Sequence, residues 1–211
     1  MNIKVSALVA AALLCGGLTQ ASAATLSFDN VQFPGTGVPL SVTASDGTVF
    51  TFSAGPSSQF QSFTSGGIGS FPAGVTFLAA GLGNSAPINV SFSVPLSSIS
   101  IPVSSDRVGN SPFTSTVQFF NGASSVGSST QSGNTLNPPL TFSFSGAATT
   151  SALISTSAMS LFGFTQNIGP ITFERASSVV VPGPIAGAGI PALMALGGFV
   201  WARRRKAAAV S

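Results

Sequence analysis

The chain has 211 residues, of which only 5% are charged, with seven basic residues, four acidic residues and no histidine. Lys4 and the run 203–206 hold five of the basic residues, so the interior keeps two arginines against four carboxylates, 2 − 4 = −2. Because nucleic-acid binding needs a basic surface, this composition excludes nucleic acid as a partner. A surface with so little net charge has weak electrostatic repulsion and tends to associate.

The N-terminus has the pattern of a secretory signal peptide. Lys4 precedes the apolar run 5–18, and Ala21-Ser22-Ala23 supplies a small-residue end. We expect a signal peptide over residues 1–23, with cleavage after Ala23, or alternatively after Ala24. Cys15, the one cysteine of the chain, lies in the apolar run. The mature protein is therefore expected to have neither disulfides nor thiol chemistry.

The interior, residues 24–180, shows an alternation of apolar and hydroxyl residues that is typical of β-strands. The clearest example is 88–94, where Ile, Val and Phe alternate with Asn and Ser. The same period of two occurs at 40–44, 50–52, 117–119, 140–144 and 171–173. We therefore predict an antiparallel β-sandwich with phenylalanines on the inner faces and hydroxyls on the outer faces.

Turn signals separate several of these strands. Ser45-Asp46-Gly47 predicts a hairpin turn, and Asn121-Gly122 predicts a second one, followed by a Ser/Gly-rich strand that ends near Thr130. Pro95 and Pro102 bracket residues 96–101, which favours an edge strand or a strand start there. No interior stretch has both the length and the spacing of a helix.

Phenylalanine dominates the aromatic content, with 18 residues and no tyrosine. Sites that need an amphipathic ring usually use tyrosine. Because the chain has no tyrosine, we expect most of the phenylalanine rings to lie in the core. Phe60, Phe63 and Phe71 flank or lie in a Gly/Ser-rich stretch, and they are the candidate contact patch.

The interior offers little catalytic inventory. Without histidine, a serine nucleophile has no usual base, and acid–base chemistry falls to four carboxylates that are far apart in sequence: Asp29, Asp46, Asp106 and Glu174. We therefore expect no catalytic residues, no cofactor and no zinc site. A structural calcium held by the oxygens of Asp29, Asn30 and Asp106 is left open. A hydrolase that uses the four carboxylates is the least favoured alternative.

The C-terminus combines three features in order. Val181-Pro182-Gly183-Pro184 breaks regular structure, and an apolar run extends from Ile185 to Trp201. A helix of this length spans roughly 26 Å, close to a bilayer core of ~30 Å. The basic cluster Arg203, Arg204, Arg205 and Lys206 follows and predicts a cytoplasmic end. We expect a single transmembrane helix at 185–201.

This order resembles the PEP-CTERM sorting signal of Gram-negative bacteria. Val181, Pro182 and Pro184 match the motif of this signal, residues 185–201 match its helix, and residues 203–206 match its basic end. Gly183 stands where the commonest form has glutamate, and the run Val181–Pro184 resembles a VPGP-type subtype of the signal. The resemblance, which covers 181–206, implies an exosortase as partner, export through the inner membrane and transient anchoring before release to the cell surface.

The interior is also loosely similar to the β-sandwich ectodomains that often precede this signal, which are jelly-roll-like in layout. The residues that carry this similarity are 88–99, 119–122, 161–164 and 171–173. Together these features predict a non-catalytic structural or adhesive protein of the cell surface or extracellular matrix. The alternative is a carbohydrate-binding module for exopolysaccharide.

Overall fold

The computed structural model describes residues 23–29, 31–65, 71–80, 86–105, 111–157 and 166–177. The chain divides into two units, 1–177 and 178–211, and all described residues belong to the first. The predicted sorting signal, the helix at 185–201 and all of the signal peptide except Ala23 lie outside them. Among the described residues there is no helix that is long and apolar enough to cross a membrane.

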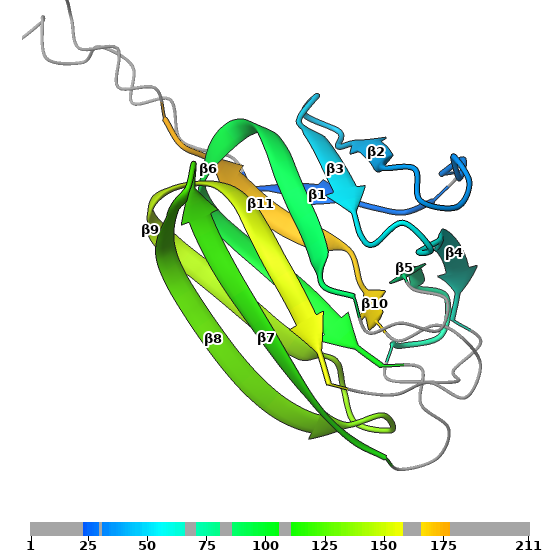
Figure 1. Cartoon of the computed structure of the whole chain (residues 1–211). Helices are drawn as coiled ribbons and strands as arrows, with labels where there is room; N and C mark the ends of the chain where they lie inside the picture. The colour runs from blue at the N-terminus through cyan, green and yellow to red at the C-terminus, as the bar shows by residue number, and fades with distance from the viewer. Residues whose placement is uncertain are drawn as a thin grey trace, which may run out of the picture. The chain divides into compact units, whose positions relative to one another are not determined.

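The described residues form eleven strands whose pairings are all antiparallel (Figure 1). This confirms the predicted all-β antiparallel class. The strands are β1 (Ala24–Leu26), β2 (Leu40–Thr43), β3 (Val49–Ser53), β4 (Phe60–Thr64), β5 (Thr76–Ala80), β6 (Ile88–Ser104), β7 (Pro112–Asn121), β8 (Ser124–Asn134), β9 (Leu140–Thr156), β10 (Gln166–Ile168) and β11 (Ile171–Arg175).

The long central strand β6 bends and carries the sheet from one layer to the next. Phe50 of β3 pairs with Phe92, and Phe173 of β11 pairs with Ile99, 99 − 92 = 7 residues further along. In a straight strand those positions are roughly 23 Å apart, yet the rings of Phe50 and Phe173 lie 4.9 Å apart. The pairing of β6 with β9 is irregular between Ser91 and Ser98, where the fold-over occurs.

The neighbouring strand β9 folds over in the same way. Phe119 of β7 pairs with Ala152, eight residues (152 − 144) from Phe144, yet the rings of Phe119 and Phe144 are 5.0 Å apart. Gly146, with φ of 127°, lies between the two halves. One layer therefore contains β2, β3, the first half of β6, the second half of β9, β7 and β8. The other contains β4, β5, β10, β1, β11 and the remaining halves of β6 and β9.

The prediction of an edge strand between Pro95 and Pro102 is wrong, because β6 runs through both prolines at the centre of the sheet. Neither proline removes a hydrogen bond from the sheet, because its missing N–H lies where the ladder of inter-strand hydrogen bonds is interrupted. Pro95 lies in the irregular stretch of β6. The oxygen of Pro102 accepts a bond from the N–H of Gly169, so its nitrogen also faces the break between β10 and β11.

The core lies between the two layers and is built from the predicted apolar positions. Phe50, Phe52, Phe142 and Phe173 are essentially fully buried. Both predicted turns are confirmed, with Gly47 at φ 84° and Gly122 at φ 59°. The strand after the second turn continues to Asn134, beyond the predicted end near Thr130.

Candidate functional site

The outer surface of the layer that contains β7 and β8 is rich in hydroxyl groups, and we call it the hydroxyl face. It runs from β2 across β3, β6, β9 and β7 to β8. None of the outward side chains of these strands is charged. Its hydroxyl residues are Ser41, Thr43, Thr51, Ser53, Ser91, Ser93, Thr114, Thr116, Ser128, Thr130, Ser132, Ser151 and Ser155.

Several of these hydroxyls are paired across neighbouring strands. Thr114 and Ser132 lie 2.8 Å apart, as do Thr116 and Thr130, and Ser41 lies 3.1 Å from Thr51. Each hydroxyl has more hydrogen-bonding capacity than one such contact uses. The face can therefore keep its own ladder of hydrogen bonds and still bind water or a polyhydroxyl partner.

A second surface feature is a row of three rings, Phe63, Phe77 and Phe71, which we call the phenylalanine row. Phe63 of β4 pairs directly with Phe77 of β5, and their ring centroids are 6.0 Å apart. Phe71 stacks on Phe77 at 5.1 Å with an interplanar angle of 17°. The row begins at an exposed ring and ends at a buried one, since Phe63 is 40% exposed and Phe71 5%.

The three residues of the predicted contact patch occupy different environments. Phe60 is 4% exposed and packs in the core against Phe52. Phe63 is three positions further along β4 and therefore faces the opposite way. Sequence reasoning missed Phe77, whose place beside Phe63 depends on the β4–β5 register.

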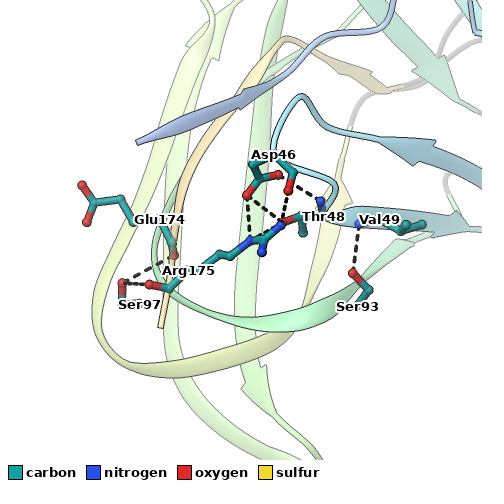
Figure 2. A network of polar contacts seen from close by, with 7 residues as sticks. All are labelled: Asp46, Thr48, Val49, Ser93, Ser97, Glu174 and Arg175. Atoms are coloured by element: carbon teal, nitrogen blue, oxygen red, sulfur yellow. Dashed lines mark hydrogen bonds and ion pairs between the residues drawn. The ribbon is translucent and has the colours of Figure 1, made fainter. Parts of the chain in front are cut away.

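The densest polar network joins three segments and is drawn in Figure 2. Nε of Arg175 lies 2.7 Å from Oδ2 of Asp46 and 3.0 Å from Oγ1 of Thr48, and a guanidinium N–H also donates to the Asp46 carbonyl. The N–H and hydroxyl of Thr48 each donate to the Asp46 carboxylate at 2.9 Å. We call this network the Asp46–Arg175 clip.

Further contacts extend the clip to the bend of β6. Oγ of Ser97 donates to the Arg175 carbonyl at 3.1 Å, and the N–H of Ala176 donates to the Pro95 carbonyl at 2.9 Å. Oγ of Ser93 accepts a bond from the N–H of Val49 at 2.9 Å. The clip therefore fastens the end of β11 to both the β2–β3 turn and the bend of β6.

The chemistry of the clip is structural. Burial raises the pKa of the Asp46 carboxyl, but the bonds from Thr48 and the guanidinium of Arg175 outweigh it and lower the pKa below its ordinary value. A carboxylate held ionised by a permanent cation is a poor proton donor. The side chain of Glu174 points away from the network, so the two carboxylates do not form a catalytic pair (Figure 2).

Three buried oxygen atoms have no hydrogen-bond partner among the described residues: Ser105 Oγ, Gln166 Oε1 and Asn167 Oδ1. Gln166 and Asn167 are neighbours on β10, so their side chains face opposite sides of the sheet and cannot share an ion. No group of three His, Cys, Asp or Glu residues that could bind a metal occurs in the described part of the chain. Asn30 and Asp106 of the calcium hypothesis lie outside it.

The residues of the predicted sorting motif, Val181 to Pro184, and the basic cluster 203–206 also lie outside the described residues. Their assignment stays a prediction from the sequence.

Comparisons with known proteins give structural likeness only. No protein-family model and no curated protein matches the chain. Among solved structures it is similar to CBM29_1, a family 29 carbohydrate-binding module from Piromyces equi, at 12% identity and a TM-score of 0.30, covering 60% of this chain and 91% of that one. It is also similar to the family 11 carbohydrate-binding module of the cellulosomal cellulase Lic26A-Cel5E of Clostridium thermocellum, at 10% identity and a TM-score of 0.32, covering 60% and 88%. At these values the likeness carries no conclusion about what this chain binds.

Proposed function

We propose that this chain is an exported, non-catalytic protein of the cell surface or extracellular matrix of a Gram-negative bacterium, with a structural or adhesive role. The observation that carries the proposal is the hydroxyl face, an uncharged surface that spans six strands. Such a surface makes many weak, neutral contacts, which suits a matrix of polysaccharide and protein. The clip supports the non-catalytic part, because it ties up one of the few carboxylates in an ion pair.

The delivery part of the proposal rests on the two ends of the sequence. The signal peptide over 1–23 sends the chain through the inner membrane, and the PEP-CTERM-like segment 181–206 presents it to an exosortase. In this proposal the helix at 185–201 anchors the chain transiently before the ectodomain reaches the surface.

The intact mass of the mature protein from its native host tests delivery, with an exosortase-deleted strain as the control. We expect the parent strain to yield a chain that lacks the leader and ends near Val181–Pro184. The deleted strain should yield a chain that retains 203–206. A mass that retains 203–206 in both strains would overturn exosortase sorting and leave a plain membrane anchor.

A second candidate function is binding of exopolysaccharide, and the phenylalanine row favours it. Sugar rings present C–H faces that pack on aromatic rings, and the exposed ring of Phe63 lies beside the tilted ring of Phe77, on which Phe71 stacks. Gln61 lies two positions before Phe63 on the same exposed side of β4 and offers an amide for hydroxyls. Sugar sites more often use Trp or Tyr, so this remains the second candidate.

Retention of host exopolysaccharide in affinity electrophoresis tests this candidate with a matched pair of variants. Phe63→Ser should reduce retention at least fivefold, because it removes the exposed end of the row. Phe33→Ser is the control, since Phe33 is similarly exposed, at 36%, but no ring stacks on it among the described aromatic contacts. Equal retention by both variants and the parent would end the candidate.

A further inference from the structure

The edge strand β8 is the longest uncapped edge of the described sheet. It has 11 residues and pairs with β7 on one side, while no described strand pairs with its other side. The other edges are shorter, with five residues in β4, four in β2 and three in β1, and the first part of β9, residues 140–145, which pairs only with β6. In an antiparallel edge strand, alternate residues direct both backbone groups outward, so about five N–H and five C=O groups of β8 face away from β7.

Proteins usually protect such an edge, and most of the length of β8 lacks the usual protection. Lysine, other charges, proline and bulges are the common devices. Strand β8 contains no charged residue and no proline, and residues 5–205 contain no lysine at all. Its one register shift lies beside the turn, at Phe119/Phe120, and leaves Gly127 to Asn134 in regular pairing.

The surrounding structure also holds this edge in an ordered, extended form. Gly127 and Gly133 lie so close to the second layer that an added Cβ would meet Phe144 at 3.0 Å and Leu140 at 2.9 Å. The side-chain amide of Gln131 donates to the carbonyl of Thr141 at 2.9 Å. A strand ordered before it binds loses less conformational entropy on pairing.

We propose that β8 is an assembly edge, which pairs antiparallel with β8 of a second copy of this chain. Identical strands related by a two-fold axis form such a contact with the same residues on both sides. The strand is neutral, so self-pairing brings no like charges together. Its exposed side chains are small, and no large apolar side chain on it selects a different sequence.

The consequence of this pairing is that the hydroxyl faces of two copies become one continuous surface. Backbone bonds at an edge replace bonds to water, so each adds little and the association is expected to be weak. It becomes effective where copies are concentrated, as on a cell surface. The assembly edge makes a second copy of this chain the partner in the proposed structural role, and it therefore rests on that proposed function.

Sedimentation velocity of the full-length chain in mild detergent, over a hundredfold range of concentration, tests the proposal. The parent should associate reversibly. Thr130→Lys places a charge in the middle of the edge and should raise the dissociation constant at least tenfold. Ser91→Lys adds the same charge to the same face but on the central strand β6, and should change it less than twofold.

Hydrogen exchange of the unmutated chain gives a second readout that does not depend on the folding of a variant. Amides of β8 should gain protection as the concentration rises, while those of β2 and β4 should not. A parent that stays monomeric, an equal effect of the two lysine variants, or unchanged exchange in β8 would each overturn the assembly edge. These results do not depend on C-terminal processing, so failure here and failure of exosortase sorting are distinguishable.

Discussion

The outer surfaces of the β7–β8 hairpin and the β4–β5 hairpin differ, although both arise from alternating strands. The first carries paired hydroxyls, such as Thr116 and Thr130 at 2.8 Å, and the second carries the rings of Phe63 and Phe77 at 6.0 Å. In the first, the contacts join strands that are adjacent in sequence. In the second, the row extends to Phe71, which packs over Gly169, 98 residues away (169 − 71). The alternation along each strand determines which side chains face outward. Contacts with segments that are distant in sequence determine what kind of surface those side chains form.

The largest effect should come from the core ring that links the two layers. Phe50 is fully buried and contacts Phe173 at 4.9 Å and Phe92 at 5.2 Å. Phe50→Ala should lower the free energy of unfolding by about 3–5 kcal/mol. Phe63→Ala, at a position that is 40% exposed and beside Phe77, should cost only about 0.5–1.5 kcal/mol. Urea denaturation followed by circular dichroism measures both, and similar losses would show that Phe63 is part of the core.

The next effect concerns the glycine beneath the phenylalanine row. A Cβ on Gly169 would lie 2.5 Å from Phe71 Cε1 and 3.2 Å from Pro102 Cβ. Gly169→Ala should therefore displace the Phe71 ring and cost about 1–3 kcal/mol of unfolding free energy. The matched control is Gly55→Ala, whose added Cβ would make an ordinary contact of 3.4 Å with Ala86.

A double variant sharpens this test. If the clash with the ring is the cause, Gly169→Ala should cost much less in a Phe71→Ala background, because the space above Gly169 is then open. Equal cost in both backgrounds would assign the effect to the backbone of the β10–β11 link instead.

Local patterns in the sequence predicted the strands and turns well. The alternation at 88–94 and the Asp46-Gly47 turn depend on neighbouring residues, and both have the predicted form. The opposite orientations of Phe60 and Phe63 also follow from their odd spacing, so the separation of the predicted patch was available from the sequence.

Long-range pairings were not predictable in this way. The prolines of β6 suggested an edge, because nothing local shows that their missing N–H groups face breaks in the neighbouring ladder. The Asp46–Arg175 contact joins residues 129 positions apart in the sequence. The predicted hairpin turn already explained why an aspartate stands at position 46, so the sequence did not point to a distant partner. The exposed edge of β8 was not predictable either, because it depends on which strands pair with a neighbour on one side only.

The clip should have a smaller, pH-dependent effect. Because the pKa of Asp46 is lowered in the folded state, its contribution is complete above the unfolded pKa of ~3.9 and is lost as the pH falls through the folded value. Arg175 is 45% exposed, so solvent screening limits the pair to about 0.5 kcal/mol. Asp46→Asn should lower the unfolding free energy by this amount at pH 7 and flatten its fall below pH ~4. Asp29→Asn, at an exposed carboxyl, is the control.

The smallest effect should come from the hydroxyl ladder, and it tests whether this ladder serves stability or the surface. Thr116→Val keeps the β-branched shape of the side chain and removes the 2.8 Å contact with Thr130. Because the pair is exposed, water can replace the lost bond, and the cost should be about 0.2–0.5 kcal/mol. A double-mutant cycle with Thr130→Val, followed by thermal unfolding, isolates the pair. A coupling above about 1 kcal/mol would show that the ladder holds β7 and β8 together. A smaller value would mean that packing and backbone bonds already fix the hairpin, so that the hydroxyls are free to serve contacts outside the molecule.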